Sequence, residues 1–503
     1  MKCRKNLRKL IQEYVASADK PNTTLMKLKK AILDLKNPAI RPSLIPAAQG
    51  DGALSRYDDF VWAHMRVMMD GPNNGVNGGP GPNWAHRGPS FGPWHRELLK
   101  LYEEELRSVS GDPNLCLPYW NWTKDRTSAD PGFPFFTEFL GGDGAGNVHD
   151  RVTTGDFAQA NGWTLNVDEE NFGYLRRRFG GGGPDALPTG LLPTATSART
   201  CLTRTPYDST PWNQSVASGS SFRNTLEGWV TPNIHNTVHV WVSGSMLPGT
   251  SPNDPVFFLH HNNIDRLWAV WQQKNPALAQ YLPDNTTASA SGVTRLNDRM
   301  ATFGRTATDR YFGVDATPAD VSNSKAITWY DSDLPELNNE TGGTLSFNSV
   351  PVGLTSYKAV KFRVTGCREV RFRITGAPNG QFGVTSMGTE FTATPDDNAP
   401  FVYGYVWVQL VSVAGPIANS ALDIHAYIID DEGYYAPNEN DEYALGDFHV
   451  QLTATSVARD NNAVALVLDR SGSMGAPAGG TSTRSSLLKN AVGVFNTDRK
   501  AHV

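Results

Sequence analysis

The stretch that constrains this chain most runs from Ser251 to Trp268 and reads S-P-N-D-P-V-F-F-L-H-H-N-N-I-D-R-L-W. Its first five residues are typical of a turn and a helix start, and apolar residues then recur at helical spacing. The predicted helix carries two adjacent histidines, His260 and His261. Neighbouring helical residues point about 100° apart, so we expect only one of the two to reach a shared metal ion.

A second histidine pair lies just upstream, in N-I-H-N-T-V-H-V-W. His235 and His239 are four residues apart, so on a helix they project from the same face. Neutral imidazole is a ligand for copper, zinc, iron or nickel, and three imidazoles per ion leave a position open for a small ligand. This pair and one histidine of the 260–261 pair therefore predict a metal site.

Three further histidines form a similar group nearer the N-terminus. His64 lies in the helical pattern S-R-Y-D-D-F-V-W-A-H-M-R-V-M-M, whereas His86 and His95 lie in A-H-R-G-P-S-F-G-P-W-H-R-E. We expect His95 to open a helix and His86 to lie in the loop before it. Two such triplets facing each other could act together on one oxygen molecule. The spacing alone leaves copper and zinc both open.

Residues 1–315 carry all of these motifs, and their periodicity is helical. Apolar residues recur at helical spacing over 7–15, 24–36, 55–69 and 95–109, with Gly/Pro-rich loops between. Metal sites are often built from facing helices of a bundle. We therefore predict a mainly α, four-helix-bundle catalytic domain that holds two metal ions.

The residue pattern changes from about 340 to 455. Segments 359–365, 369–375 and 405–413 alternate or are rich in β-branched residues, and Gly, Pro and Asn flank them. This pattern is typical of short antiparallel strands. We predict a β-rich domain over 316–455, of sandwich or barrel type.

Residues 456–503 have a third pattern. A-V-A-L-V-L-D-R-S-G-S-M-G reads as a buried strand ending in D-x-S-x-S, which resembles the start of a von Willebrand factor A domain. Asp469, Ser471 and Ser473 would match the first loop of its magnesium or calcium site. Only the beginning of such a domain fits in 456–503, so we expect the site to be incomplete. The alternative is a chance match in an ordinary strand and turn.

The composition limits the classes of partner. A net charge of −5 and a pI of about 6.1 argue against nucleic acid, and no apolar run reaches membrane-spanning length. The basic N-terminal residues are not followed by an apolar segment, so a secretory signal is not expected and a cytoplasmic location is favoured. The four cysteines are expected to be buried free thiols, with one disulfide left open.

Five long motifs appear in an order that resembles bacterial tyrosinases of the type 3 copper family, from about Arg4 to Tyr311. They are H-R-G-P-S-F-G-P-W-H-R-E, L-P-Y-W-N-W, F-R-N-T-L-E-G-W, N-I-H-N-T-V-H-V-W-V-S-G and the stretch that includes His261. The resemblance implies two copper ions, with molecular oxygen as co-substrate. It assigns the first copper to His64, His86 and His95, and the second to His235, His239 and His261.

The resemblance also implies residues around the copper pair. Glu227 and Asn236 match a pair that orients and activates a water, which would help to deprotonate a phenol whose pKa is near 10. A solvated helix charge and a helix cap are the alternatives for these two. Phe91 and Phe257 would line the substrate pocket, and Val240 and Ser243 its entrance. We expect Asp265 and Arg266 to anchor their helix through an ion pair with a residue such as Arg87.

The predicted activity is hydroxylation of monophenols to o-diphenols and oxidation of o-diphenols to o-quinones. The alternatives are a catechol or o-aminophenol oxidase, a hemocyanin-like oxygen carrier, and a non-enzymatic adhesion protein. A helper protein for copper loading is a candidate partner. In several relatives a C-terminal domain covers the copper site. By that resemblance residues 316–455 are a candidate lid, with an aromatic plug from among Tyr403, Tyr405, Tyr434 and Tyr435, and cleavage near residue 320 should raise activity.

Overall fold

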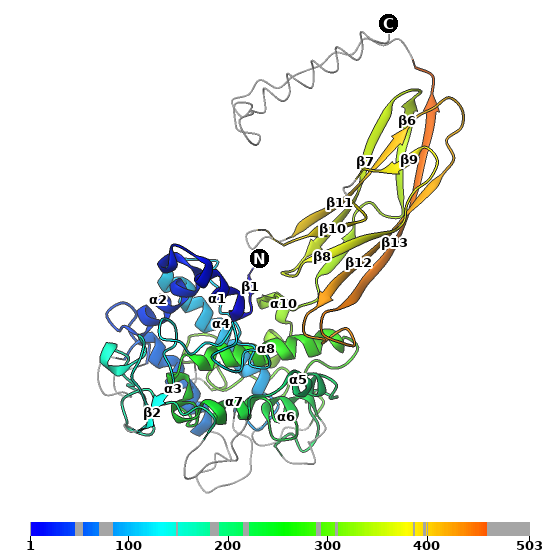
Figure 1. The fold of residues 1–503 in the computed structure, drawn as a ribbon. Helices are drawn as coiled ribbons and strands as arrows, with labels where there is room; N and C mark the ends of the chain where they lie inside the picture. Colours follow the sequence, from blue (N-terminus) through cyan, green and yellow to red (C-terminus); the bar gives the residue numbers. More distant parts are fainter. Residues whose placement is uncertain are drawn as a thin grey trace.

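The chain folds into a helical domain and an elongated β-sandwich that extends from one side of it (Figure 1). The structure is a computed structural model of the 503-residue chain. It describes residues 2–45, 54–69, 84–146, 149–181, 191–214, 221–287, 293–306, 310–385, 388–395, 399 and 401–459. Asp469, Ser471 and Ser473 lie outside these ranges, so the predicted partial cation site stays a prediction.

Eight helices of the described residues build most of the helical domain. They are α1 (Leu7–Ala16), α2 (Thr24–Lys36), α3 (Arg56–Met69), α4 (Phe91–Ser110), α5 (Ala195–Leu202), α6 (Phe222–Glu227), α7 (His235–Val242) and α8 (Val256–Lys274). Two single-turn helices, α9 (Pro318–Val321) and α10 (Ser324–Ile327), follow them. Within this domain α3, α4, α7 and α8 carry five of the six predicted ligands, which confirms the predicted di-metal helical bundle.

Local sequence signals explain where these helices begin and end. The Asn6 side chain accepts the Arg8 backbone N–H and caps α1. Helix α4 ends at Ser110 and is capped by Gly111, whose φ of 69° is a left-handed conformation that glycine adopts without strain. The expectation that His95 opens α4 was wrong, because the helix begins four residues earlier, at Phe91. His95 therefore lies one turn inside the helix.

The sandwich consists of two packed sheets. The five-stranded sheet has the order β10-β8-β12-β13-β6 and the four-stranded sheet the order β5-β7-β11-β9. Inward residues of the two sheets, such as Val360, Val406 and Ile424, form a separate hydrophobic core. This confirms the β-rich region predicted from the alternating pattern. The strands are β5 (Glu336–Asn339), β6 (Thr344–Pro351), β7 (Thr355–Thr365), β8 (Val370–Gly376), β9 (Phe382–Val384), β10 (Glu390–Ala393), β11 (Val402–Val411), β12 (Ser420–Asp430) and β13 (Asp441–Val457).

The two domains are joined near the N-terminus. Strand β1 (Cys3–Arg4) pairs in parallel with β4 (Trp329–Tyr330), so the helical domain extends past residue 315 to Tyr330. A disulfide links Cys3 to Cys367, which lies between β7 and β8 of the sandwich. The expectation of buried free thiols was therefore wrong for these two cysteines, which form the one disulfide that the sequence left open. Their separation of 364 residues gives no sequence signal for the pairing. Cys116 and Cys201 are free thiols.

Two short strands, β2 (Gly144–Ala145) and β3 (Arg151–Val152), form a small ladder on the helical domain. Within the described part of the chain, no helix is both long and apolar enough to cross a membrane.

Candidate metal centre

The first histidine triplet is assembled from two helices and the loop between them. His64 lies on α3, His95 on α4, and His86 in the loop that precedes α4. The ring centroids are 5.1 Å apart for His64 and His86, and 4.8 Å apart for His86 and His95. One ring nitrogen from each of the three lies within 4.8 Å of the others. These three side chains can therefore bind one ion.

The second triplet has its ring nitrogens closer together. His235 and His239 lie one turn apart on α7, as their spacing predicted. The Nε2 of His261, on α8, lies 3.2 Å from Nε2 of His235 and 3.3 Å from Nε2 of His239. Three nitrogens that converge in this way match the geometry of a three-imidazole metal site.

The two triplets face each other across a short distance. The rings of His95 and His261 are stacked, with centroids 4.2 Å apart and an interplanar angle of 15°. The His86 and His235 rings lie 6.0 Å apart. Two ions held in these triplets would therefore be near neighbours, as a binuclear site requires.

Hydrogen bonds at Nδ1 aim several of these rings. A neutral imidazole carries one N–H, and a backbone carbonyl can only accept, so Nδ1 is the donor in each bond to a carbonyl. The Nε2 lone pair then points into the site, which is the usual arrangement for a ligating histidine. The bonds run from His64 to Gly249 O (2.6 Å), from His95 to Phe91 O (2.8 Å), from His239 to Met246 O (2.6 Å), and from His235 to the Asn236 side-chain oxygen (2.9 Å).

Two ring nitrogens of the first triplet have the properties expected of metal ligands. The Nε2 atoms of His64 and His95 are buried without a hydrogen-bond partner among the described residues. A buried polar atom is normally satisfied, so two such nitrogens without a hydrogen-bond partner fit ligands of a cation. The donor set is imidazole only, which suits copper.

Burial sets the charge of the site. Desolvation is the main cause that lowers the pKa of each site histidine, and it lowers that of His64 and of His239 to about 4. The pKa of the other four ligand candidates falls well below the usual value, again mainly through burial. The rings are therefore neutral near pH 7, which leaves their nitrogen lone pairs available to a cation.

His260 is a fourth histidine in the second group. It is fully buried, and its Nδ1 lies 3.1 Å from Nε1 of Trp122. The indole N–H can only donate, so Nδ1 of His260 is the acceptor. Sequence reasoning did not identify Trp122 as the partner of His260, because the L-P-Y-W-N-W motif does not indicate which side chain Trp122 contacts.

Glu227 and Asn236 lie beside the second triplet. Glu227 is fully buried at the end of α6, and Asn236 is half-buried on α7. Arg223 donates to Glu227 Oε2 at 3.0 Å, and the Arg87 backbone N–H donates to Oε1. Burial raises the pKa of the Glu227 carboxyl, and Arg223 opposes that rise. The alternative of a solvated helix charge is therefore wrong for Glu227; the i,i+4 spacing of Arg223 was a usable signal for this pair.

Aromatic rings surround the histidines. The Phe91 ring centroid lies 5.0 Å from that of His95 and 4.9 Å from that of His235. The Phe257 ring lies 4.1 Å from His261 and 5.0 Å from His64. Both phenylalanines are fully buried, so they form apolar walls between the two triplets.

The two predicted entrance residues lie at the end of α7. Val240 is half-buried on that helix. Ser243 follows the helix with a φ of 58°, and its backbone N–H donates to the His239 carbonyl at 2.8 Å. Ser243 thus ends the helix immediately after the ligand His239. Their role at an entrance stays a prediction.

The expected ion pair with Arg87 was wrong. Asp265 instead accepts from Nε of Arg96 at 2.5 Å and lies 3.4 Å from Nη1 of Arg4, and all three side chains are buried. Nη1 of Arg266 lies 3.6 Å from Oε1 of Glu432, a residue of the β12–β13 loop of the sandwich. The Arg87 guanidinium lies over the Trp229 ring instead. The helix is anchored as expected, but by residues far away in sequence.

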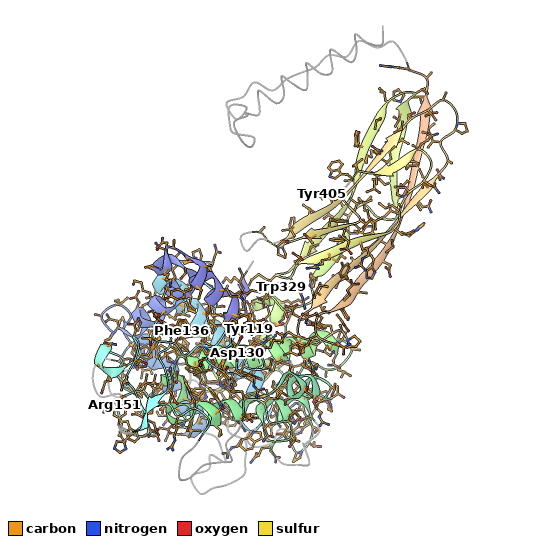
Figure 2. The ribbon with its side chains drawn as sticks, viewed as in Figure 1. Tyr119, Asp130, Phe136, Arg151, Trp329 and Tyr405 are labelled. Atoms are coloured by element: carbon orange, nitrogen blue, oxygen red, sulfur yellow. A yellow bond between two sulfur atoms is a disulfide. The ribbon has the colours of Figure 1, made fainter. Side chains whose placement is uncertain are left out.

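The four tyrosines considered as plugs do not contact the site. Tyr403 and Tyr405 lie along β11, where Tyr405 is 42% exposed and remote from the helical domain (Figure 2). Tyr434 and Tyr435 pack at the C-terminal half of α8, beside Arg266 and Lys274. None of these four rings plugs the histidine centre in this structure.

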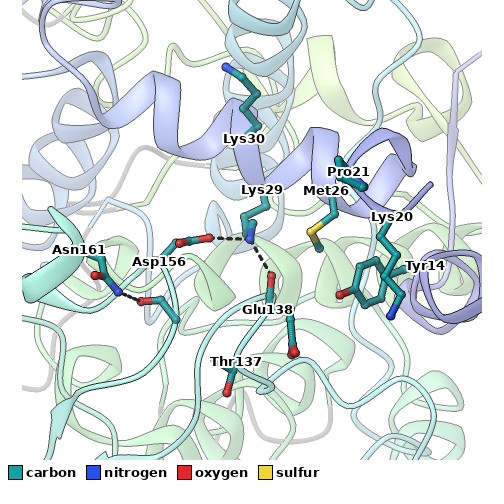
Figure 3. A pocket seen from close by; sticks show the side chains of 11 residues that line it. Tyr14, Lys20, Pro21, Met26, Lys29, Lys30, Thr137, Glu138, Asp156 and Asn161 are labelled. Atoms are coloured by element: carbon teal, nitrogen blue, oxygen red, sulfur yellow. Dashed lines mark hydrogen bonds and ion pairs between the residues drawn. The ribbon is translucent and has the colours of Figure 1, made fainter. Parts of the chain in front are cut away.

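A separate cavity of about 680 Å³ opens beside α2 (Figure 3). Tyr14, Met26 and three lysines line it, together with residues of the loops around 137–161. Lys29 is held there by Asp156 and by the Glu138 carbonyl. None of its lining residues is a site histidine, so this cavity is not the predicted substrate pocket.

Comparisons with known proteins agree with this geometry. The family description "Common central domain of tyrosinase" matches residues 54–274. The tyrosinase of Streptomyces glaucescens is 40% identical over 279 residues, which cover 55% of this chain and 89% of that relative. The tyrosinase of Streptomyces antibioticus is 42% identical over 253 residues, 50% of this chain and 84% of that relative. The grixazone synthase of Streptomyces griseus is 34% identical over 301 residues, 55% of this chain and 90% of that relative.

A solved tyrosinase from Burkholderia thailandensis shares 13% identity with this chain, and the match covers 90% of this chain and 91% of that chain, with a TM-score of 0.37. The two histidine triplets and the sequence relatives together define a type 3 binuclear copper protein. The chain belongs to the tyrosinase family. Its catalytic class is that of the copper monooxygenases and oxidases.

Proposed function

We propose that this chain hydroxylates monophenols at the ortho position and oxidises the resulting o-diphenols to o-quinones, with molecular oxygen as co-substrate. The observation that carries the proposal is the pair of facing triplets with neutral imidazoles, of which five are buried and that of His239 is half-buried. When bound, two copper ions supply the redox chemistry that transfers oxygen to the ring. The protein's own groups hold the ions, exclude bulk water and hold the one water that accepts the phenolic proton.

In this proposal His64, His86 and His95 hold one copper, and His235, His239 and His261 hold the other. The hydrogen bond from Trp122 supports His261 over His260 as the ligand. For His260 to bind a metal through Nε2 while neutral, its proton would have to lie on Nδ1, where it would face the indole N–H. The convergence of the Nε2 atoms of His235, His239 and His261 supports the same choice.

Glu227 and Asn236 are the proposed water-holding pair. The Glu227 backbone carbonyl and the Asn236 side-chain oxygen both lie within hydrogen-bond distance of Nδ1 of His235, which places the two residues beside this ligand. In the proposal, the Glu227 carboxylate and the Asn236 amide hydrogen-bond a water that accepts the phenol's proton. Phe91 and Phe257 would keep other water away from the copper pair, because their rings pack directly on the histidines. Val240 and Ser243 would border the entrance.

Turnover of a monophenol tests this proposal. Copper-loaded protein is given tyramine and, separately, its o-diphenol, and quinone formation is followed. Oxidation of the diphenol without hydroxylation of tyramine would favour a catechol or o-aminophenol oxidase. Reversible oxygen binding with neither reaction would favour a hemocyanin-like carrier.

Three further expectations stay predictions. A copper-loading helper protein is proposed only from the family resemblance, as is a lid role for residues 316–455. The partial magnesium or calcium site at Asp469 is proposed only from its sequence pattern. The Cys3–Cys367 disulfide weighs against the expected cytoplasmic location, because disulfides persist mainly in oxidising compartments.

A further inference from the structure

The loop between β12 and β13, residues 431–440, contacts the helical domain at the C-terminal half of α8 (Figure 1). Tyr434 of this loop is only 2% exposed and belongs to the hydrophobic core of the helical domain rather than to that of the sandwich. Its backbone carbonyl accepts from Lys274 of α8. The sandwich therefore supplies part of the core that packs behind the histidine-bearing helix.

The same loop supplies a counter-charge to a buried arginine of α8. Arg266, five residues after His261, is fully buried, and its Nη1 lies 3.6 Å from Glu432 Oε1. Among the described residues, Glu432 supplies the one carboxylate that forms an ion pair with Arg266. Its Nε donates to Asn263, and its Nη2 donates to the Tyr434 hydroxyl at 3.4 Å. A guanidinium cannot shed its proton, so burial without a nearby carboxylate would be costly.

Glu432 also holds the segment that reaches the second triplet from the other side. Nδ2 of the fully buried Asn121 donates to Glu432 Oε1 at 2.7 Å. The next residue is Trp122, whose indole N–H donates to His260. One carboxylate from the sandwich thus contacts both α8 and the Trp122 loop.

We propose that Glu432 is a positioning residue for the second copper site and that the sandwich buttresses α8 from behind. Loss of its carboxylate leaves Arg266 unpaired and frees Asn121, so the geometry of His261 relative to His235 and His239 relaxes. The prediction is opposite to that for a lid, for which detaching the C-terminal domain raises activity. It rests on the proposed function only in naming copper as the metal.

Glu439, a partly exposed residue of the same loop, offers a matched control variant. Glu439 pairs with Arg199 at 2.9 Å and with Lys124 at 3.5 Å, and its side chain is 36% exposed. Ion pairs at such exposed positions contribute little to stability. Glu439→Gln therefore alters the same interface without touching α8.

The test uses the full chain, loaded with copper and then dialysed against a chelator, with bound copper per chain measured over time. We expect Glu432→Ala to lose one copper about tenfold faster than the wild type. A factor of this size is typical when residues that support metal ligands are removed. Glu439→Gln should match the wild type. Arg266→Met combined with Glu432→Ala removes the stranded charge and should recover much of the retention.

Glu432→Gln keeps an acceptor for Asn121, and so covers the case in which the alanine variant does not fold. The rate of copper loss from Glu432→Gln should lie between those of the wild type and Glu432→Ala. Equal copper retention in Glu432→Ala, Glu432→Gln and the wild type would overturn the proposal, as would higher activity in Glu432→Ala. Failure of the wild type to hydroxylate a phenol would count against the proposed function instead, because copper retention is measured without substrate.

Discussion

Trp122 donates its indole N–H to Nδ1 of His260, and the bond is 3.1 Å long. It places the proton of a neutral His260 on Nε2, so Nε2 of this histidine has no lone pair available for a metal ion. His261, the next residue, directs Nε2 at His235 and His239. A tryptophan 138 residues upstream thus separates the roles of two neighbouring histidines.

This relationship predicts different metal contents for two alanine variants. His261→Ala should bind one copper per chain, because it removes a converging nitrogen. His260→Ala should keep both, with a stability loss of about 1–3 kcal/mol from an unsatisfied Trp122 N–H. Metal analysis of the purified proteins measures the difference. Two coppers in His261→Ala would overturn the ligand assignment.

Glu227→Gln should separate the two reactions of the proposed function. The amide keeps the shape but cannot take a proton, so tyramine hydroxylation should fall about 100-fold, whereas diphenol oxidation should fall far less. Quinone formation from each substrate gives the ratio. Glu105→Gln, which alters an ion-paired glutamate on α4 with partners Arg41 and Arg56, is the control. An equal loss on both substrates would argue against a role in deprotonation.

Much of the copper site could be predicted from the sequence because its signals are local. The i,i+4 spacing of His235 and His239 needs only a helix, and a helix is what periodicity detects best. The turn before α8 was predicted from its proline and aspartate pattern, and η7 (Ser251–Asn253) confirms it. The sequence also suggested that the two histidine triplets face each other, and the structure brings them together.

The residues that sequence reasoning missed act over long separations. Glu432 reaches Arg266 from another domain, and Cys3 pairs with a cysteine 364 residues away. Neither has a periodic or spaced pattern, because tertiary contacts between domains depend on how two finished units dock. The wrong assignment of Arg87 to Asp265 has a related cause within the helical domain: Arg4 and Arg96, both far from Asp265 in the sequence, hold that carboxylate instead.

The disulfide should be required for full stability. Cys3→Ser should lower the free energy of unfolding by about 2–4 kcal/mol, because the bond closes a very long loop and restricts the unfolded chain. Chemical denaturation of the full chain measures this change. Thiol titration of denatured, unreduced wild type should find two thiols, Cys116 and Cys201. Four thiols, with no loss of stability in Cys3→Ser, would contradict the pairing.

Asp333 should make stability depend on pH where the two domains join. It is almost fully buried, where it accepts from the Tyr330 backbone N–H and from Gln273, and burial raises its pKa from 3.8 to about 6. Between pH 4 and 6 the folded protein keeps a proton that the unfolded chain releases, so stability falls as pH rises through this window and then levels off. The shift corresponds to about 3 kcal/mol. Asp333→Asn should lack this decline, because its amide carries no charge to desolvate.

Melting temperatures of both proteins from pH 4 to 8 give the comparison. Carboxylates and histidines common to the two proteins cancel in the difference, so only position 333 contributes to its slope. We expect the difference in stability to grow in favour of Asp333→Asn from pH 4 to 6 and to stay constant above. A difference that is flat across the whole range would show that Asp333 is ionised in the fold at all of these pH values, held by its two donors against the cost of burial.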